Sequence, residues 1–238
     1  EISLSYLKKT LALEKNNPLL DKVAHIFENY VTEIIDKEDF FQMKLLLSQG
    51  EAYLRHNNLL RNNIKDSLKS SLGCIYYYLS DYIKAKQLLE ESLLNLKNDY
   101  HNNHHKIARA LMYLGNVYRT LGDCEKAKNL LEESLSIYAQ YPGNYMGNGR
   151  ALGYLGIIYR GLGDYTKASS LLEKSLEIYQ VHSQNSIGHA WVLSHLGNTH
   201  LILGNYEQAR ALLEQSLATY KKHSEDYVGV AWVLGYLG

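Results

Sequence analysis

One segment of this chain recurs at a fixed spacing. Residues 113–138 read YLGNVYRTLGDCEKAKNLLEESLSIY, and close copies follow at 154–179 and 195–220, each 41 residues after the last. A self-similar step of this length indicates supersecondary units that stack on one another and share a continuous hydrophobic core. The chain is therefore predicted to be a repeat array, which constrains its fold much more tightly than its ligand.

Each unit has the pattern of two amphipathic helices. In 104–121, Leu111 and Leu114 fall on one helical face, with polar residues opposite. Gly122 predicts a helix stop, and apolar spacing predicts a second helix over 124–140. The same pairing is predicted at 146–162 with 165–181 and at 186–203 with 206–222, and a lone first helix is predicted from near 227. The predicted fold class is all-α, an alpha-alpha superhelix built from antiparallel helix hairpins.

Copies of the repeat also lie upstream. The copy at 71–96 is offset by 42 residues, and a further step of 42 aligns 39–54 with it, matching Asp39 to Asp81. The first helix of that upstream unit is predicted at 18–35, where a proline follows two asparagines. The upstream copy is degenerate, because few of the repeated residues are kept.

The repeats predict the division of the chain. We expect a divergent N-terminal segment at 1–58, containing the degenerate repeat at 18–58, with 1–15 as the second helix of an earlier unit. An unrelated helical linker over 1–58 is the alternative. Tandem repeats are predicted over 59–238, divided as 59–100, 101–142, 143–183, 184–224 and a partial 225–238.

Small residues recur inside the predicted helices. Glycine in a helix interior costs up to about 1 kcal/mol relative to alanine, so another requirement must select it. Close helix approach is the expected reason. The recurring glycines of the first helices are Gly73, Gly115, Gly156, Gly197 and Gly238, and the small residues that face them are Ala85, Ala127, Ala168 and Ala209.

This pattern resembles the tetratricopeptide repeat, and in its long step it is similar to the kinesin-light-chain-like subtype. The motif residues of the third unit are Leu152, Leu155, Gly156, Tyr159, Gly163, Asp164, Tyr165, Ala168, Leu172 and Ser175. The step of 41–42 residues exceeds the family's usual length of roughly 34, and the closing proline is absent. The resemblance implies a right-handed superhelix whose first helices line a concave groove that holds a peptide or protein segment.

If the resemblance holds, the exposed face of the first helices is the binding surface. The predicted partner-binding residues are Arg109, Met112, Asn116, Arg119, Arg150, Ile157, Arg160, Trp191, Asn198 and Trp232. Arginine binds carboxylate or phosphate bidentately, and aromatic residues anchor peptides. We therefore expect an acidic protein segment with one bulky apolar anchor, and the resemblance implies that Asn116 and Asn198 clamp its backbone. Cys74 is expected on the same face.

Each of these groups also has a simpler interpretation. Arginines on helices are often solvated or paired with a neighbouring carboxylate. Trp191 and Trp232 stand beside Ala190 and Ala231, so they are alternatively predicted to pack between hairpins.

Composition excludes several classes of partner. Lys plus Arg and Asp plus Glu are both 25, so no net positive charge favours nucleic acid. Apolar runs are too short for a membrane span. The two cysteines have no disulfide or metal spacing, which predicts a reducing, cytoplasmic location. The chain opens at Glu1 rather than Met, so we expect a fragment whose native targeting signals lie outside it.

No catalytic or cofactor pattern emerges. His101, His104 and His105 have metal-compatible spacing, but no further ligand is fixed nearby, so a solvated loop is expected. We predict no enzyme, no cofactor and no metal site. The leading function is a protein-interaction scaffold. The alternatives are a sensor or autoinhibitory arm of a larger multidomain protein, and a self-association module acting through an exposed array end at 227–238.

Overall fold

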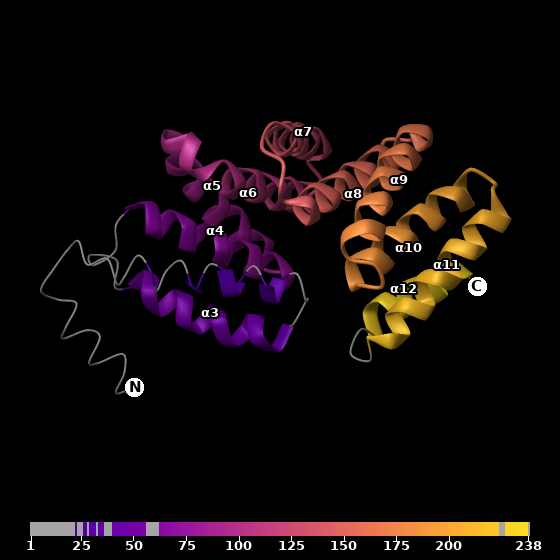
Figure 1. The fold of residues 1–238 in the computed structure, drawn as a ribbon, viewed down its shortest axis with the longest axis horizontal. Helices are drawn as coiled ribbons and strands as arrows, with labels where there is room; N and C mark the ends of the chain where they lie inside the picture. Colours follow the sequence, from indigo (N-terminus) through magenta and orange to yellow (C-terminus); the bar gives the residue numbers. More distant parts are fainter. Residues whose placement is uncertain are drawn as a thin grey trace, which may run out of the picture. The chain divides into compact units, whose positions relative to one another are not determined.

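The computed structural model describes residues 22, 26–27, 29–31, 33–35, 40–55, 62–223 and 227–237, and all regular structure in these ranges is helical (Figure 1). A 3₁₀ turn, η2 (Lys97–Asp99), precedes α6. The helices are α3 (Phe40–Arg55), α4 (Asn62–Tyr78), α5 (Tyr82–Leu96), α6 (Tyr100–Thr120), α7 (Cys124–Gln140), α8 (Tyr145–Gly161), α9 (Tyr165–His182), α10 (Ile187–Ile202), α11 (Tyr206–Lys222) and α12 (Tyr227–Leu237). The predicted segment 1–15, the predicted helix start at Pro18 and residue Asp39 lie outside these ranges.

The chain divides into two compact units, Glu1–Val117 and Tyr118–Gly238, with the boundary inside α6. In the first unit, α4 packs against both α3 and α5. In the second, each helix from α7 to α12 packs against the next one along the chain. Because short turns join most of these partners, neighbouring helices run antiparallel. Each unit is therefore a stack of helix hairpins, and the prediction of an all-α solenoid fold is confirmed.

The turns between paired helices repeat the same chemistry. Asp81, Asp123 and Asp164 each accept a hydrogen bond from the backbone N–H three residues on, at 3.0–3.1 Å, which caps the second helix. The residue directly before the cap is in the left-handed region at Gly122 (φ 92°) and Gly163 (φ 85°). The predicted helix stop at Gly122 is confirmed.

Close contact explains the glycines inside the first helices. A Cβ added to Gly73, Gly156 or Gly197 would lie 2.7–2.9 Å from the Cγ of a leucine on the paired helix. The leucines are Leu89, Leu172 and Leu213 respectively. Such distances are shorter than real Cβ contacts, so only glycine lets the helices approach this closely. The prediction of close helix approach is confirmed at these three positions.

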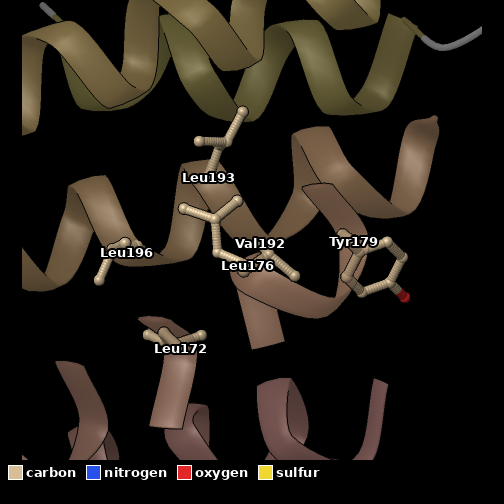
Figure 2. Close-up of a cluster of buried hydrophobic side chains, with 6 residues drawn as sticks. All are labelled: Leu172, Leu176, Tyr179, Val192, Leu193 and Leu196. Atoms are coloured by element: carbon tan, nitrogen blue, oxygen red, sulfur yellow. The ribbon is translucent and has the colours of Figure 1, made fainter. Parts of the chain in front are cut away.

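The core lies between successive helices. Figure 2 shows one cluster, in which three side chains of α9 meet three of α10, all at most 9% exposed. They are Leu172, Leu176, Tyr179, Val192, Leu193 and Leu196. Burying a side chain of this size stabilises the fold by roughly 1.5–3 kcal/mol. A second cluster between α10, α11 and α12 continues the core.

A lysine–tyrosine pair joins the two helices of several hairpins. The Nζ of Lys167 donates to the hydroxyl of Tyr159 at 2.7 Å, and it also lies 4.0 Å from the centre of the ring. Lys126 and Tyr118 repeat this geometry, with a hydrogen bond of 2.6 Å. Lys84 and Tyr76 form a looser version at 3.4 Å. The α10–α11 hairpin has His200 and Gln208 at the corresponding positions.

Candidate partner-binding surface

The predicted surface residues of the first unit are more buried than the sequence indicates. Met112 is 1% exposed, and Asn116 and Cys74 are fully buried. The expectation that these three line an open surface is therefore wrong. The helical repeat distinguishes the two faces of one helix, but it does not show how deeply neighbouring side chains cover each face.

Polar side chains in the first unit bond to one another. The Nδ2 of Asn116 donates to the hydroxyl of Tyr77, so this amide is not available to clamp a peptide backbone as expected. Arg109 donates to the hydroxyl of Ser71 at 3.4 Å. This internal bonding weakens the case for a ligand site in the first unit.

In the second unit, α8, α10 and α12 bring four side chains together, which we call the Arg160–His195 cluster: Arg160, Trp191, His195 and Trp232. The Nη1 of Arg160 donates to the backbone carbonyl of His195 at 3.2 Å. Nη1 and Nη2 of Arg160 both lie 3.4 Å from the Nδ1 of the His195 ring. The imidazole meets two indoles edge-to-face, with ring centroids 4.9 Å from Trp191 and 6.2 Å from Trp232.

The cluster has a buried floor and an exposed edge. His195 is 4% exposed, whereas Trp232 is 56% exposed. Arg160 and Trp191 are partly buried. Trp191 and His195 are four residues apart on α10, which places them on one helical face. A ligand that contacts Trp232 would therefore lie next to His195, whose ring centre is 6.2 Å from that of Trp232.

The charge in this cluster is positive and has no internal counter-charge. Burial, followed by the repulsion of Arg160 and Arg119, holds the pKa of His195 well below its usual range, so the ring is neutral at physiological pH. Burial also lowers the pKa of Arg160; Tyr236 opposes this in part, and Arg119 adds to the lowering. Among the residues that the structure describes, no carboxylate pairs with Arg160. A partly buried cation without an anionic partner favours an anionic ligand group.

The other predicted residues divide by exposure. Ile157, Asn198 and Arg119 are partly buried, and all three belong to the second unit. Arg150 is 7% exposed, so the expectation that it lies open on the surface is wrong.

Trp191 has a packing role. A Cβ at Gly153 would lie 2.6 Å from its indole ring, and Tyr154 meets the indole edge-on at 5.2 Å. Trp191 also packs against the core clusters on both sides of α10. The alternative prediction, that this tryptophan packs between hairpins, is confirmed, whereas Trp232 remains largely exposed.

His195 is the cluster residue that the sequence reasoning missed. The 41-residue step aligns it with Tyr113, Tyr154 and Tyr236, so it replaces a recurrent tyrosine. This replacement of a recurrent tyrosine by histidine is the sequence feature that could have identified His195 as a site residue.

The histidine-rich segment before the second repeat is helical rather than a loop. Residues 100–105 form the first turns of α6, which corrects the expected solvated loop. The rings of His104 and His105 lie 4.3 Å apart, while the side chain of His101 is outside the described part of the structure. Across the described residues, no group of three or more His, Cys, Asp or Glu side chains is placed to hold a metal ion. None of the helices described combines the length and the apolar character needed to cross a membrane.

Comparisons with known proteins agree with this architecture. The family model described as "Tetratricopeptide repeat" matches residues 67–140, 147–222 and 189–238. A search of curated proteins gave no match. BtubC (BKLC) from P. vanneervenii is similar in structure, with TM-score 0.61 and 18% identity over 83% of this chain and 79% of that chain.

Two further solved structures have the same fold. A kinesin light chain-like protein of Podosopora anserina, with nearly identical TPR-like repeats, has TM-score 0.56 and 18% identity over 85% of this chain and 97% of that chain. Bacillus thuringiensis PlcR, solved with the peptide PapR7 and DNA, has TM-score 0.68 and 14% identity over 89% of this chain and 74% of that chain. At these identities the likeness concerns the fold alone.

Proposed function

Because the chain belongs to the tetratricopeptide repeat family, we propose that it is a non-catalytic protein-interaction scaffold that holds a peptide or protein segment at the Arg160–His195 cluster. The observation that carries this proposal is a partly buried Arg160 with no carboxylate partner among the described residues, beside the exposed indole of Trp232. Repeats of this family commonly present such surfaces to protein segments. PlcR, which shares the fold, was solved with a bound peptide.

We propose that the bound segment is acidic and carries one apolar anchor. The guanidinium of Arg160 has more donors than its contacts with His195 use, and a carboxylate accepts such donors in pairs. Arg119 adds positive charge close to Arg160. The exposed face of Trp232 offers an apolar surface that matches the aromatic anchors typical of peptide interfaces. Ile157 and Asn198, both partly buried, complete the predicted surface.

Intrinsic fluorescence offers a direct test, because the only two tryptophans of the chain, Trp191 and Trp232, both belong to the cluster. The probe is a set of capped nonapeptides in which Glu-Asp is flanked by leucine, with Gln-Asn counterparts. We expect the acidic peptides to change tryptophan emission, and Arg160→Ala to weaken binding by about tenfold or more, as expected for loss of a charge-assisted contact.

Arg210→Ala is the matched control, because Arg210 is an exposed arginine paired with Glu214 on α11. Its affinity should equal that of the unmodified chain. The proposal would be wrong if the chain bound the Glu-Asp and Gln-Asn peptides with equal affinity. It would also be wrong if the Arg160→Ala variant bound the acidic peptides as tightly as the unmodified chain does.

A second candidate function, self-association, is favoured by α12. Leu234 and Leu237 are 51% and 37% exposed. Their counterparts one step earlier, Leu193 and Leu196, are at most 3% exposed. An apolar helix face without cover favours contact with another protein surface. The remaining expectations, namely a sensor or autoinhibitory arm, a cytoplasmic location, and the exclusion of nucleic acid and membrane as partners, stay predictions.

A further inference from the structure

The tautomer of His195 follows from its contact with Arg160. A guanidinium has only donors, so the Nδ1 of His195, 3.4 Å from both Nη atoms, must be an acceptor. In a neutral imidazole with an unprotonated Nδ1, the proton is on Nε2. The Nε2–H group has no hydrogen-bond partner among the residues that the structure describes. Nε2 is not one of the fully buried atoms that lack a partner, so it keeps some access to solvent although the residue is only 4% exposed.

The two nitrogens of an imidazole point to nearly opposite sides of the ring. Arg160 therefore lies on the Nδ1 side, and Nε2–H points away from the guanidinium. The neighbouring rings, Trp191 and Trp232, each meet the imidazole edge-to-face and offer it no acceptor oxygen. One carboxylate bound to the far side of the guanidinium does not reach Nε2. The donor is open to an acceptor from outside the chain, and a bound segment that covered it without supplying an acceptor would lose about 1–3 kcal/mol.

We infer that His195 is itself a ligand-binding residue, whose Nε2–H donates to a backbone carbonyl of the bound segment while Arg160 binds the acidic side chain of the same segment. This inference rests on the proposed function. It gives His195 the backbone-holding role that the sequence analysis expected of Asn116, whose amide bonds to Tyr77 instead. The ring stays neutral because burial and the two arginines keep its pKa well below the usual range.

Two substitutions of His195 distinguish its proposed contact with the ligand from its contact with Arg160. In His195→Gln, the amide nitrogen can occupy the Nε2 position, so a donor to the ligand is kept. In His195→Asn, the shorter amide can occupy the Nδ1 position, so an acceptor for Arg160 is kept and the ligand donor is lost. We expect His195→Asn to weaken binding of the Glu-Asp nonapeptide by about three- to tenfold, and His195→Gln to weaken it less.

Salt distinguishes the two contacts. The loss caused by Arg160→Ala should shrink as salt is raised, because it removes a charge–charge contact. The loss caused by His195→Asn should not change, because the donor and the carbonyl are both neutral. His200→Asn is the matched control, since His200 bonds to Asn205 at the α10–α11 turn and lies outside the cluster.

Nitrogen NMR provides a second readout that does not depend on variants folding. The unmodified chain should show His195 as the Nε2–H tautomer, and the Nε2 resonance should shift when the peptide saturates the site. If no acidic peptide binds, the proposed function itself fails. If peptides bind and Arg160→Ala weakens them, yet His195→Asn binds normally or Nε2 does not shift, only the inference about His195 is overturned.

Discussion

The turn residue Ser80 carries the backbone strain of one hairpin. Its φ is 64°, in the left-handed region where the corresponding turns have Gly122, Gly163 and Gly204 at φ 77–92°. A side chain in this conformation costs roughly 1–2 kcal/mol, which glycine avoids. The hydroxyl recovers little of this cost, since its contact with Tyr82 is exposed and 3.5 Å long.

Ser80→Gly should therefore stabilise the protein. We expect the free energy of unfolding in urea to rise by about 0.5–1 kcal/mol, because relief of the strain exceeds the extra entropy of glycine in the unfolded chain. Ser183→Gly is the control, since Ser183 ends α9 with φ −157°, which any residue adopts. A gain at Ser183 as large as the gain at Ser80 would contradict the explanation.

Site residues were harder to predict than core residues. Leu172 and Leu213 repeat in the sequence and are fully buried, so their pattern was a sufficient guide. Asn116 lies on the predicted polar face, but burial against neighbouring side chains such as Tyr77 is a property of the stack that the sequence of one helix does not contain. His195 is a single departure from a recurrent tyrosine, and its role depends on Arg160, 35 residues away.

At the scale of the helix, the predicted boundaries agree well with the structure at two helices that have an Asp or Asn directly before them. The second helix predicted at 124–140 is α7 (Cys124–Gln140), and the one predicted at 206–222 is α11 (Tyr206–Lys222). Each follows an Asp or Asn at the helix start. The prediction was less accurate for α6, which begins at Tyr100, directly after Asn98 and Asp99, rather than near 104.

The α10–α11 hairpin lacks the lysine–tyrosine pair that joins α8 to α9. His200 and Gln208 stand where that hairpin has Tyr159 and Lys167. The double variant His200→Tyr with Gln208→Lys should create the missing pair. We expect a gain of roughly 0.5–1 kcal/mol in the free energy of unfolding, from one hydrogen bond and a cation–π contact near the surface.

The two single variants are the controls for this prediction. A double-mutant cycle should show that the gain appears mainly when both changes are present, because the interaction needs both side chains. If the stability gain of the double variant equalled the sum of the gains of the two single variants, no pair would form between the two helices.

At the scale of the whole molecule, α12 predicts concentration-dependent assembly. An exposed apolar face that contains Leu234 and no charged residue is expected to pair with another copy. Light scattering of the unmodified chain should show a mass that rises with concentration, and Leu234→Lys should lower it to the monomer value because burial of an ammonium is unfavourable.

Val181→Lys is the control, because Val181 is 76% exposed at the end of α9, away from this face. It should leave the mass unchanged. A strictly monomeric mass for the unmodified chain at all concentrations would rule out self-association through α12.

Two buried serines show how such a chain can grow during evolution. The hydroxyl of Ser175 donates to the carbonyl of Gly149 at 2.6 Å, and Ser216 donates to Ala190 at 2.7 Å, with the same separation of 26 residues. Since equivalent atoms make the same bond 41 residues later, a duplicated segment inherits a complete set of partners. Gene duplication can therefore lengthen the protein in one step, and mutation can then alter the copies where they meet ligands.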